Sequence, residues 1–299
     1  MVAGAGSDRW GRRPFLVCGP LALFVLLWST GFIGAKFGLP DAGPLTFLSW
    51  RYAAVLLLMG AVVLWARAPW PRAPWAWLHI GVSGLLVHGV YLGGVFTAIG
   101  RGLPAGLTAL VVGLQPLITA LGASLLLGER LRPPQWLGLG LGLAGVGLVV
   151  AQKAHAAAGA PLLPLLAPAV LALLGITAGT LYQKRFCPAF DLRTGALIQF
   201  APCLVATLEL AAVTEDLQVR WTGHFVFALG WLVLVLSLGA VSLLNLLIRR
   251  GSAVHVASLF YLTPPTTALI AWALFGETLH GLALLGMALA VTGVWLVRR

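Results

Sequence analysis

Charge is scarce in this sequence. Only 9% of its 299 residues are charged, whereas a soluble domain carries about 25% charge. Hydrophobic residues make up 60% of the chain. A soluble fold could not cover so much apolar material with so few polar side chains, so lipid must form part of the solvent. The composition therefore excludes a soluble globular domain and predicts an integral protein of the lipid bilayer.

Acidic residues are rarer still, at 8 Asp and Glu against 19 Lys and Arg. The net charge of +11 does not call for a nucleic-acid partner, because basic residues of membrane proteins gather in cytoplasmic loops. The 3 cysteines are too few for a disulfide framework. The sequence has no H-E-x-x-H, C-x-x-C, P-loop or G-x-S-x-G motif. We therefore expect no enzymatic activity, no catalytic residues, no metal and no cofactor.

One apparent motif is rejected. Gly140, Gly142 and Gly145 match the spacing of a dinucleotide fingerprint, which needs a strand, a turn and a helix around it. Here the glycines lie inside an apolar run. Small residues that let membrane helices approach closely explain them better.

What the sequence does contain is a duplication. Gly128-Glu129-x-Leu131 is repeated 148 residues later as Gly276-Glu277-x-Leu279. The same shift superposes Pro116 on Pro264, and upstream it superposes Ser29-Thr30-Gly31 on Thr177-Ala178-Gly179. One constant shift without a gap predicts two repeats, at 15–152 and 162–299, after a cytoplasmic tail at 1–14.

A membrane-spanning helix needs about 20 mostly apolar residues. Ten such spans are expected, five in each repeat, at Phe15–Gly38, Pro44–Trp65, Trp75–Ile99, Leu103–Leu127, Pro134–Ala151, Leu162–Arg185, Leu192–Ala212, Gly223–Ile248, Ala253–Phe275 and Gly281–Val297.

The basic residues orient these spans. With the N-terminus in the cytoplasm, fourteen Lys and Arg fall on the inner side and five on the outer side, the five including Lys36 and Arg51 near helix ends. This satisfies the positive-inside rule and places both termini in the cytoplasm. Five spans per repeat then invert the second repeat relative to the first. The expected fold is all-α, with two inverted five-helix repeats and a binding site near the midplane.

A family resemblance adds to this interpretation. Each repeat closes with P-x-x-T-A-L…G-E-x-L and a Gly-rich final helix, and the first span contains Trp28-Ser29-Thr30-Gly31-Phe32-Ile33-Gly34-Ala35-Lys36. The whole chain resembles the EamA family of the drug/metabolite transporter superfamily, and is most similar to YddG-type aromatic amino-acid exporters. The second repeat departs from the first-span signature, because Ile176 stands opposite Trp28. The resemblance implies export of small metabolites across the bacterial inner membrane.

Polar and aromatic residues near the middle of the spans are candidates for substrate binding, because polar groups in lipid tend to face a wet interior. These candidates are Trp28, Ser29, Lys36, His88, Tyr91, Gln115, Thr177, Tyr261 and Thr263. Pro116 and Pro264 remove helix hydrogen bonds and could free backbone groups for a ligand. The alternatives are a harmless kink for each proline, a snorkelling side chain for Lys36, and a hydrogen-bonded core residue for His88, which is the preferred reading.

Charged residues at the span ends suggest gates. Arg101 and Arg249 obey the 148-residue shift, as do Glu129 and Glu277. Arg101 and Glu277 are expected on the outer side, and Arg249 and Glu129 on the inner side. The preferred alternative is that the glutamates only cap the following helices.

The expected function is export of small amphipathic metabolites, most of all aromatic or large neutral amino acids, by a monomer or, alternatively, a dimer. The rival is a multidrug or cationic-compound exporter. Such an exporter should hold an acid at midplane, whereas the single acid expected within a span is Glu209, in the outer half of its helix. A membrane enzyme and a scaffold are weaker alternatives.

Overall fold

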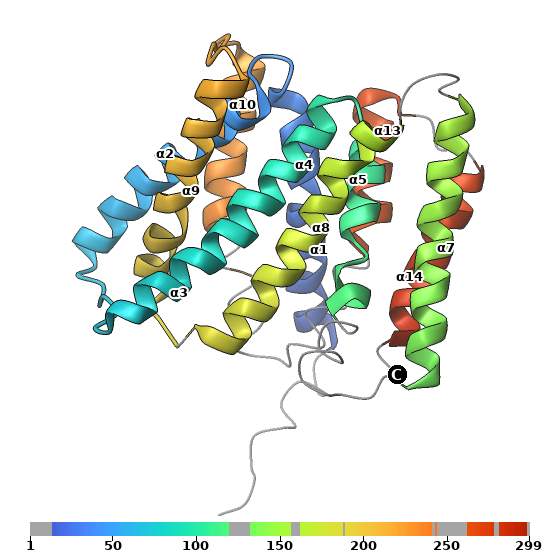
Figure 1. Ribbon diagram of the computed structural model, residues 1–299, viewed down its shortest axis with the longest axis horizontal. Helices are drawn as coiled ribbons and strands as arrows, with labels where there is room; N and C mark the ends of the chain where they lie inside the picture. Colours follow the sequence, from blue (N-terminus) through green and yellow to red (C-terminus); the bar gives the residue numbers. More distant parts are fainter. Residues whose placement is uncertain are drawn as a thin grey trace, which may run out of the picture.

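The computed structural model describes residues 14–119, 132–156, 162–187, 189–240, 243, 262–277 and 281–297. Within these ranges the regular structure is helical, apart from one isolated bridge between Ala42 and Val219. The elements, with η marking π-helix, are α1 Pro14–Gly38, α2 Pro44–Trp65, α3 Pro74–Gly84, η1 Leu85–Val90, α4 Tyr91–Gly100, α5 Ala105–Val112, α7 Pro133–Ala156, α8 Leu162–Phe186, α9 Leu192–Thr214, α10 Gly223–Gly230, η2 Trp231–Ala240, α13 Thr263–Phe275 and α14 Gly281–Val297 (Figure 1).

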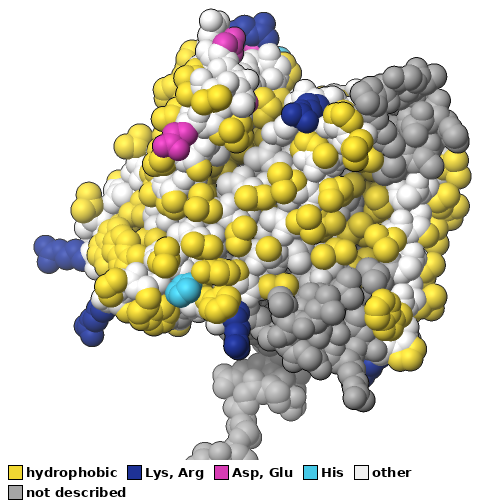
Figure 2. All heavy atoms as spheres, viewed as in Figure 1, with side chains coloured by type: hydrophobic (Ala, Val, Ile, Leu, Met, Phe, Trp, Pro, Cys, Tyr) yellow, Lys and Arg dark blue, Asp and Glu magenta, His cyan; other side chains and the backbone are white. Residues whose placement is uncertain are grey.

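Five helical stretches are long and apolar enough to cross a membrane: Pro44–Trp65, Pro74–Gly100, Leu163–Gln183, Leu192–Thr214 and Gly223–Ala240. Shorter apolar helices cover Ala22–Gly38, Ala105–Thr119, Trp136–Leu148 and Gly281–Gly293. Hydrophobic side chains cover much of the face shown in Figure 2, and the charged side chains visible there lie towards its margins. The all-helical architecture with apolar helices of membrane-span length is confirmed, and the described helices overlap the expected spans, although α5, η2 and α13 each cover only part of one.

The helices pair in a regular way. α2 packs along α9, α5 along α13, and α7 along α14, while α1 contacts α10 and η2 and α8 contacts α4 and η1. The 148-residue shift carries α1 onto α8, α2 onto α9, α3 onto α10 and α7 onto α14, so the α2–α9 and α7–α14 pairs each join equivalent helices. The two π-helical segments also correspond, because the shift carries Leu85–Val90 into Trp231–Ala240.

Glycines bring α7 and α14 into backbone contact. A Cβ at Gly145 would lie 2.4 Å from the carbonyl oxygen of Gly286, and a Cβ at Gly293 would lie 2.4 Å from that of Gly138. Since 138 and 286, and 145 and 293, are equivalent positions of the two repeats, the contact is reciprocal. Only residues without side chains allow two helices to approach this closely.

The upper end of the bundle in Figure 1 is tied by its loops. Glu215, after α9, accepts hydrogen bonds from the backbone N–H groups of Leu45 and Thr46 at 2.9 and 2.8 Å. A carboxylate satisfies the free amides and complements the dipole at the start of α2. Asp41 accepts from Arg220 at 3.1 Å, which joins the loop after α1 to the loop before α10.

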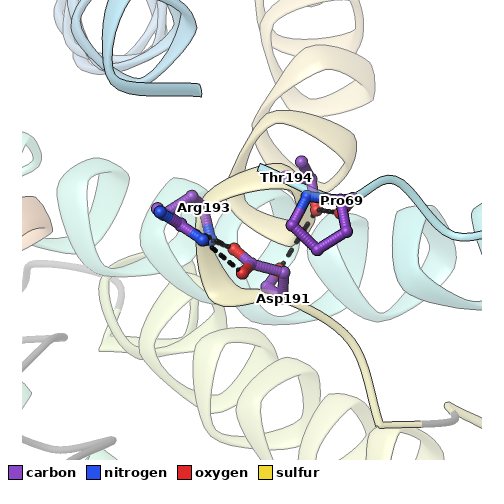
Figure 3. Close-up of polar contacts among 4 residues, drawn as sticks. All are labelled: Pro69, Asp191, Arg193 and Thr194. Atoms are coloured by element: carbon purple, nitrogen blue, oxygen red, sulfur yellow. Dashed lines mark hydrogen bonds and ion pairs between the residues drawn. The ribbon is translucent and has the colours of Figure 1, made fainter. Parts of the chain in front are cut away.

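The lower end is closed by the start of α9 (Figure 3). Asp191 accepts from the Arg193 backbone N–H at 2.9 Å and from the Arg193 guanidinium at 2.7 and 3.0 Å. The hydrogen bonds from the Arg193 side chain, with smaller contributions from backbone amides, lower the pKa of Asp191 to about 2. The Thr194 hydroxyl donates to the Pro69 carbonyl at 2.9 Å, so the α2–α3 loop is held against α9.

Candidate functional site

A small cavity lies where α1, α4, α5, α8 and α13 meet. Its volume is about 20 Å³, and its walls are Trp28, Phe32, Tyr91, Ala109, Val112, Gly113, Gln115, Pro116, Ile176 and Thr263. That volume has room for about one water molecule. The sequence-predicted residues Trp28, Tyr91, Gln115, Thr263 and Pro116 are thus brought together from four separate segments of the chain.

The aromatic wall depends on a change of helix type. Tyr91 is the first residue after the π-helical segment η1, whose wider turns rotate the residues that follow it relative to an uninterrupted α-helix. The Tyr52 hydroxyl donates to the backbone carbonyl of His88 inside this segment at 2.7 Å. On the opposite side, Trp28 and Phe32 lie one helical turn apart on α1 and face the cavity together.

The α5 wall is a broken helix. α5 ends at Val112, Gly113 and Leu114 form a turn, and helix resumes at Gln115. Pro116 has no N–H to donate to the Val112 carbonyl, so this break exposes backbone acceptors beside the cavity. Pro264 lies in the first turn of α13, where proline is well accommodated, and a Cβ at Gly113 would meet its ring at 2.8 Å.

An unsatisfied hydroxyl group lies in the cavity wall. The Oγ1 atom of Thr263 is buried and has no hydrogen-bond partner among the described residues; the same holds for Thr177, which does not line the cavity but follows the wall residue Ile176. Gln115, by contrast, donates to the Thr180 hydroxyl at 3.2 Å. A buried hydroxyl without a partner is costly, and a bound polar ligand would remove that cost. The cavity therefore combines aromatic surface with hydrogen-bonding groups, which suits an amphipathic small molecule.

Ser29 and His88 were expected to bind substrate, but their side chains lie outside the cavity. The Ser29 hydroxyl is fully buried, donates to Val25 at 2.7 Å and lies 3.4 Å from the Thr263 carbonyl, so it joins α1 to α13. The His88 ring stacks on Phe200 with 4.2 Å between the ring centroids. Neither side chain lines the cavity. The stacking on Phe200 agrees with the core packing, but the hydrogen bond expected of His88 stays a prediction.

The charged residues at the upper end pair differently from the expected gate. Glu277 forms an ion pair with Lys36 and accepts from the Ala105 backbone N–H at 3.3 Å. Arg101 instead donates to the Pro164 carbonyl at 3.1 Å. The expected pairing of Arg101 with Glu277 is therefore replaced by Lys36 with Glu277 in this conformation, because Lys36 at the end of α1 lies across from the end of α13. Glu129, Arg249 and Tyr261 lie outside the described residues.

A larger groove lies elsewhere and lacks polar groups. It encloses about 480 Å³ on the surface of α2, α3 and α9, and its walls are Leu56, Trp70, Trp77, Leu78, Gly81, Val82, Leu85, Leu197, Ile198, Ala201 and Pro202. Nothing in such a lining orients a polar metabolite. The smaller cavity is therefore the better candidate, despite its size.

Sequence reasoning also overlooked one charged residue. Arg51 was counted among the residues near helix ends, whereas the structure buries it with 7% exposure and places it against Ser237 of η2 at 3.1 Å. The sequence did indicate its burial, because Arg51 is a charged residue inside the mostly apolar stretch Phe47–Leu58.

Comparison with known proteins gives the family. The model of the EamA-like transporter family matches residues 19–151 and 164–299. The chain belongs to this family. It is 28% identical to an uncharacterized inner membrane transporter of Escherichia coli K12, YedA, over 96% of this chain and 92% of that protein. The apolar helices and the inner membrane transporters among its relatives support a multi-pass protein of the inner membrane, and transport is the activity that the family name gives.

Other relatives have names that mention a cargo. The chain is 27% identical to a probable terminal-alkyne amino-acid exporter of Streptantibioticus cattleyicolor, over 93% of this chain and 92% of that protein. It is 29% identical to a probable amino-acid metabolite efflux pump of E. coli K12, over 93% of each chain. A solved structure described as "Crystal structure of protein" superposes with a TM-score of 0.66 at 22% identity, covering 93% of this chain and 94% of that one. This last likeness concerns the fold alone.

Proposed function

We propose that this EamA-like transporter exports small amphipathic metabolites, most of all aromatic or large neutral amino acids. The observation that carries the proposal is the cavity itself. Trp28, Phe32 and Tyr91 offer aromatic surface, while Gln115 and Thr263 offer polar groups. The relatives described as amino-acid exporters support the same substrate class.

Transport is proposed to run by alternating access between two inverted five-helix repeats, with ten spans and both termini in the cytoplasm. The reciprocal glycine contact between α7 and α14 supports the pseudo-twofold relation, because a twofold axis makes residue i meet j where j meets i. The excess of Lys and Arg on the inner side supports this orientation. The excess remains when Arg51, which is buried, is no longer counted among the residues of the outer side. The cavity lies between helices of both repeats, where such folds bind substrate.

A multidrug or cationic-compound exporter is the second candidate. Among the described residues no Asp or Glu lines the cavity, and Glu209 is exposed on α9. A cation-binding site within the membrane should contain a carboxylate. The described part of the chain therefore favours neutral or zwitterionic cargo.

Counterflow in proteoliposomes separates the two candidates. Vesicles loaded with unlabelled phenylalanine should accumulate labelled phenylalanine, tryptophan and leucine without a pH gradient, and Glu209→Gln should behave as wild type. Trp28→Ala should weaken this uptake, whereas Trp136→Ala, an exposed tryptophan of α7, serves as the matched control. Saturable uptake of tetraphenylphosphonium without any uptake of amino acids would replace the proposal with the multidrug function.

A further inference from the structure

Arg51 is a charge inside the bundle, and it forms no ion pair with any residue that the structure describes. It lies on α2, about 10 Å along the helix from Pro44, and is 7% exposed. One guanidinium nitrogen, Nη2, donates to the neutral Ser237 hydroxyl at 3.1 Å, and Nε has no partner among the described residues. Arginine stays charged in proteins, so burial without an anion is costly. Ionisable groups kept at such cost inside a membrane mark binding sites and pathways.

The acidic residues of the chain can be accounted for individually. Of the 8 in the sequence, Asp41, Asp191, Glu215 and Glu277 are engaged at the two ends of the bundle, as described above. Glu209 and Asp216 are exposed. The remaining two, Asp8 and Glu129, lie outside the described residues, in the sequence regions assigned to the tail and a charged hinge. The segment 241–261, also outside them, contains no Asp or Glu.

Arg51 lies near elements that build the cavity wall. The hydroxyl of Tyr52, the next residue on α2, donates to the His88 carbonyl in η1, the segment that directly precedes the cavity residue Tyr91. Ser237, the hydrogen-bond partner of Arg51, belongs to η2, and the same segment reaches α1 through the Trp231 indole, which donates to Thr30 at 2.9 Å.

We propose that Arg51 binds the carboxylate of the transported substrate, an inference that rests on the proposed function and narrows it to carboxylate-bearing cargo. The unpaired Nε and a neighbouring Nη form the planar donor pair that carboxylates accept in a bidentate manner. The apolar part of the substrate then packs against Trp28 and Phe32, and its amino group meets the free Thr263 hydroxyl and the backbone acceptors at the α5 break. Arg51 also repels cationic compounds, which bring no anion to it.

Matched pairs of ligands test this assignment on the full-length protein in detergent. The affinity of the wild-type protein is compared within three ligand pairs: phenylalanine and phenylalaninamide, leucine and leucinamide, and phenylacetate and phenylacetamide. Each affinity is obtained from the rise in melting temperature with ligand concentration. Each amide keeps the shape and loses the carboxylate charge. Removing one partner of a buried charge pair is expected to weaken binding by at least about 30-fold. The variants are Arg51→Gln and Arg51→Lys, with Arg101→Gln as a matched control whose guanidinium is exposed at the upper end.

The proposal expects wild type and Arg101→Gln to prefer the carboxylates, Arg51→Gln to lose the preference, and Arg51→Lys to keep part of it. In proteoliposomes the Arg51→Lys change should raise KM more than it lowers kcat, which a general folding defect would not do. If Arg51→Gln does not fold, the graded loss in Arg51→Lys decides.

Three results overturn the role of Arg51: equal affinity of wild type for carboxylates and amides, an undiminished preference in Arg51→Gln, or binding of chloride but of no carboxylate. Binding of phenylacetate through Arg51 without binding of any amino acid would instead refute the proposed cargo and leave the carboxylate site standing.

Discussion

We predict that neutralising Glu277 opens the upper end of the bundle. Its carboxylate belongs to the second repeat, while its partners Lys36 and Ala105 belong to the first. The Lys36 ammonium also lies 4.4 Å from the centre of the Phe275 ring. One carboxylate therefore joins α1, α5 and α13 on the same side of the cavity.

The size of the effect follows from these contacts. The side chains of Lys36 and Glu277 are 30% and 16% exposed, so the ion pair contributes about 0–1 kcal/mol. The negative charge at the first turn of α5 adds about 0.3–1 kcal/mol through the helix dipole. Glu277→Gln keeps the shape and removes both terms. The closed state should lose about 0.3–2 kcal/mol, which is a shift of about 2–30-fold towards opening.

Cysteine labelling measures this shift. Cys18, Cys187 and Cys203 are replaced by serine, a single cysteine is placed at Tyr91, and an impermeant maleimide is added from the side of the upper end. Glu277→Gln should raise the labelling rate 2–30-fold. Arg101→Gln, whose guanidinium contacts the Pro164 carbonyl, should leave the rate within about twofold of the parent.

A double-mutant cycle identifies the partner. Lys36→Gln should add little once Glu277 is already neutral, because the two changes remove the same interaction. Independent effects of these two changes, together with coupling between Arg101 and Glu277, would refute the Lys36 gate and restore the pairing expected from sequence. An unchanged rate in Glu277→Gln would mean that the glutamate only caps a helix. For the inner side, neutralising Glu129 or Arg249 is expected to lower the same labelling.

Three further predictions concern packing, pH and topology. Gly145→Ala should lower the melting temperature by the equivalent of about 1–3 kcal/mol because its Cβ meets the Gly286 backbone, whereas Gly147→Ala, with open space around it, should not. Asp191→Ala should cost about 1 kcal/mol of capping at neutral pH. Because the folded pKa of Asp191 lies below the unfolded value of about 3.9, this difference should vanish as the pH falls from about 4 to 2, and a constant difference would contradict it. A single cysteine at Gly159 should react from outside the cell and one at Arg72 only from within; the reverse pattern would sink the topology.

The helices and many of the residues that line the cavity were predicted from the sequence. Apolar runs of span length located the helices, and the 148-residue shift gave their equivalence. Trp28, Tyr91 and Gln115 were found because a polar or aromatic residue near the middle of a span is conspicuous against an apolar background. That argument depends only on how deep a residue lies in the membrane. The position of a residue within an apolar span of the sequence predicts this depth well.

The sequence did not predict correctly which way several side chains point around their helix axes. His88 precedes Tyr91 by three residues, so an ideal α-helix would present both on one face, but the π-helical segment separates them. Lys36 and Glu277 meet because α1 ends across from α13, which no spacing within one repeat reveals. Arg51 was assigned to a helix end because charge is expected there, whereas its rotation on α2 turns it into the bundle.

The size of the cavity bears on how the protein must move. Pockets that bind small molecules enclose about 300–1,000 Å³, whereas this one measures about 20 Å³, so the conformation described is closed around its site. Enlarging it requires α5 and α13 to separate, since Gly113 and Pro264 are in contact there. The α7–α14 contact has no interlocking side chains at Gly145 and Gly293, so it can serve as the axis on which the halves rock. We expect the Lys36–Glu277 ion pair, which joins α1 to the end of α13, to break on opening, so that a pair worth about 0–1 kcal/mol can shift the balance between the states.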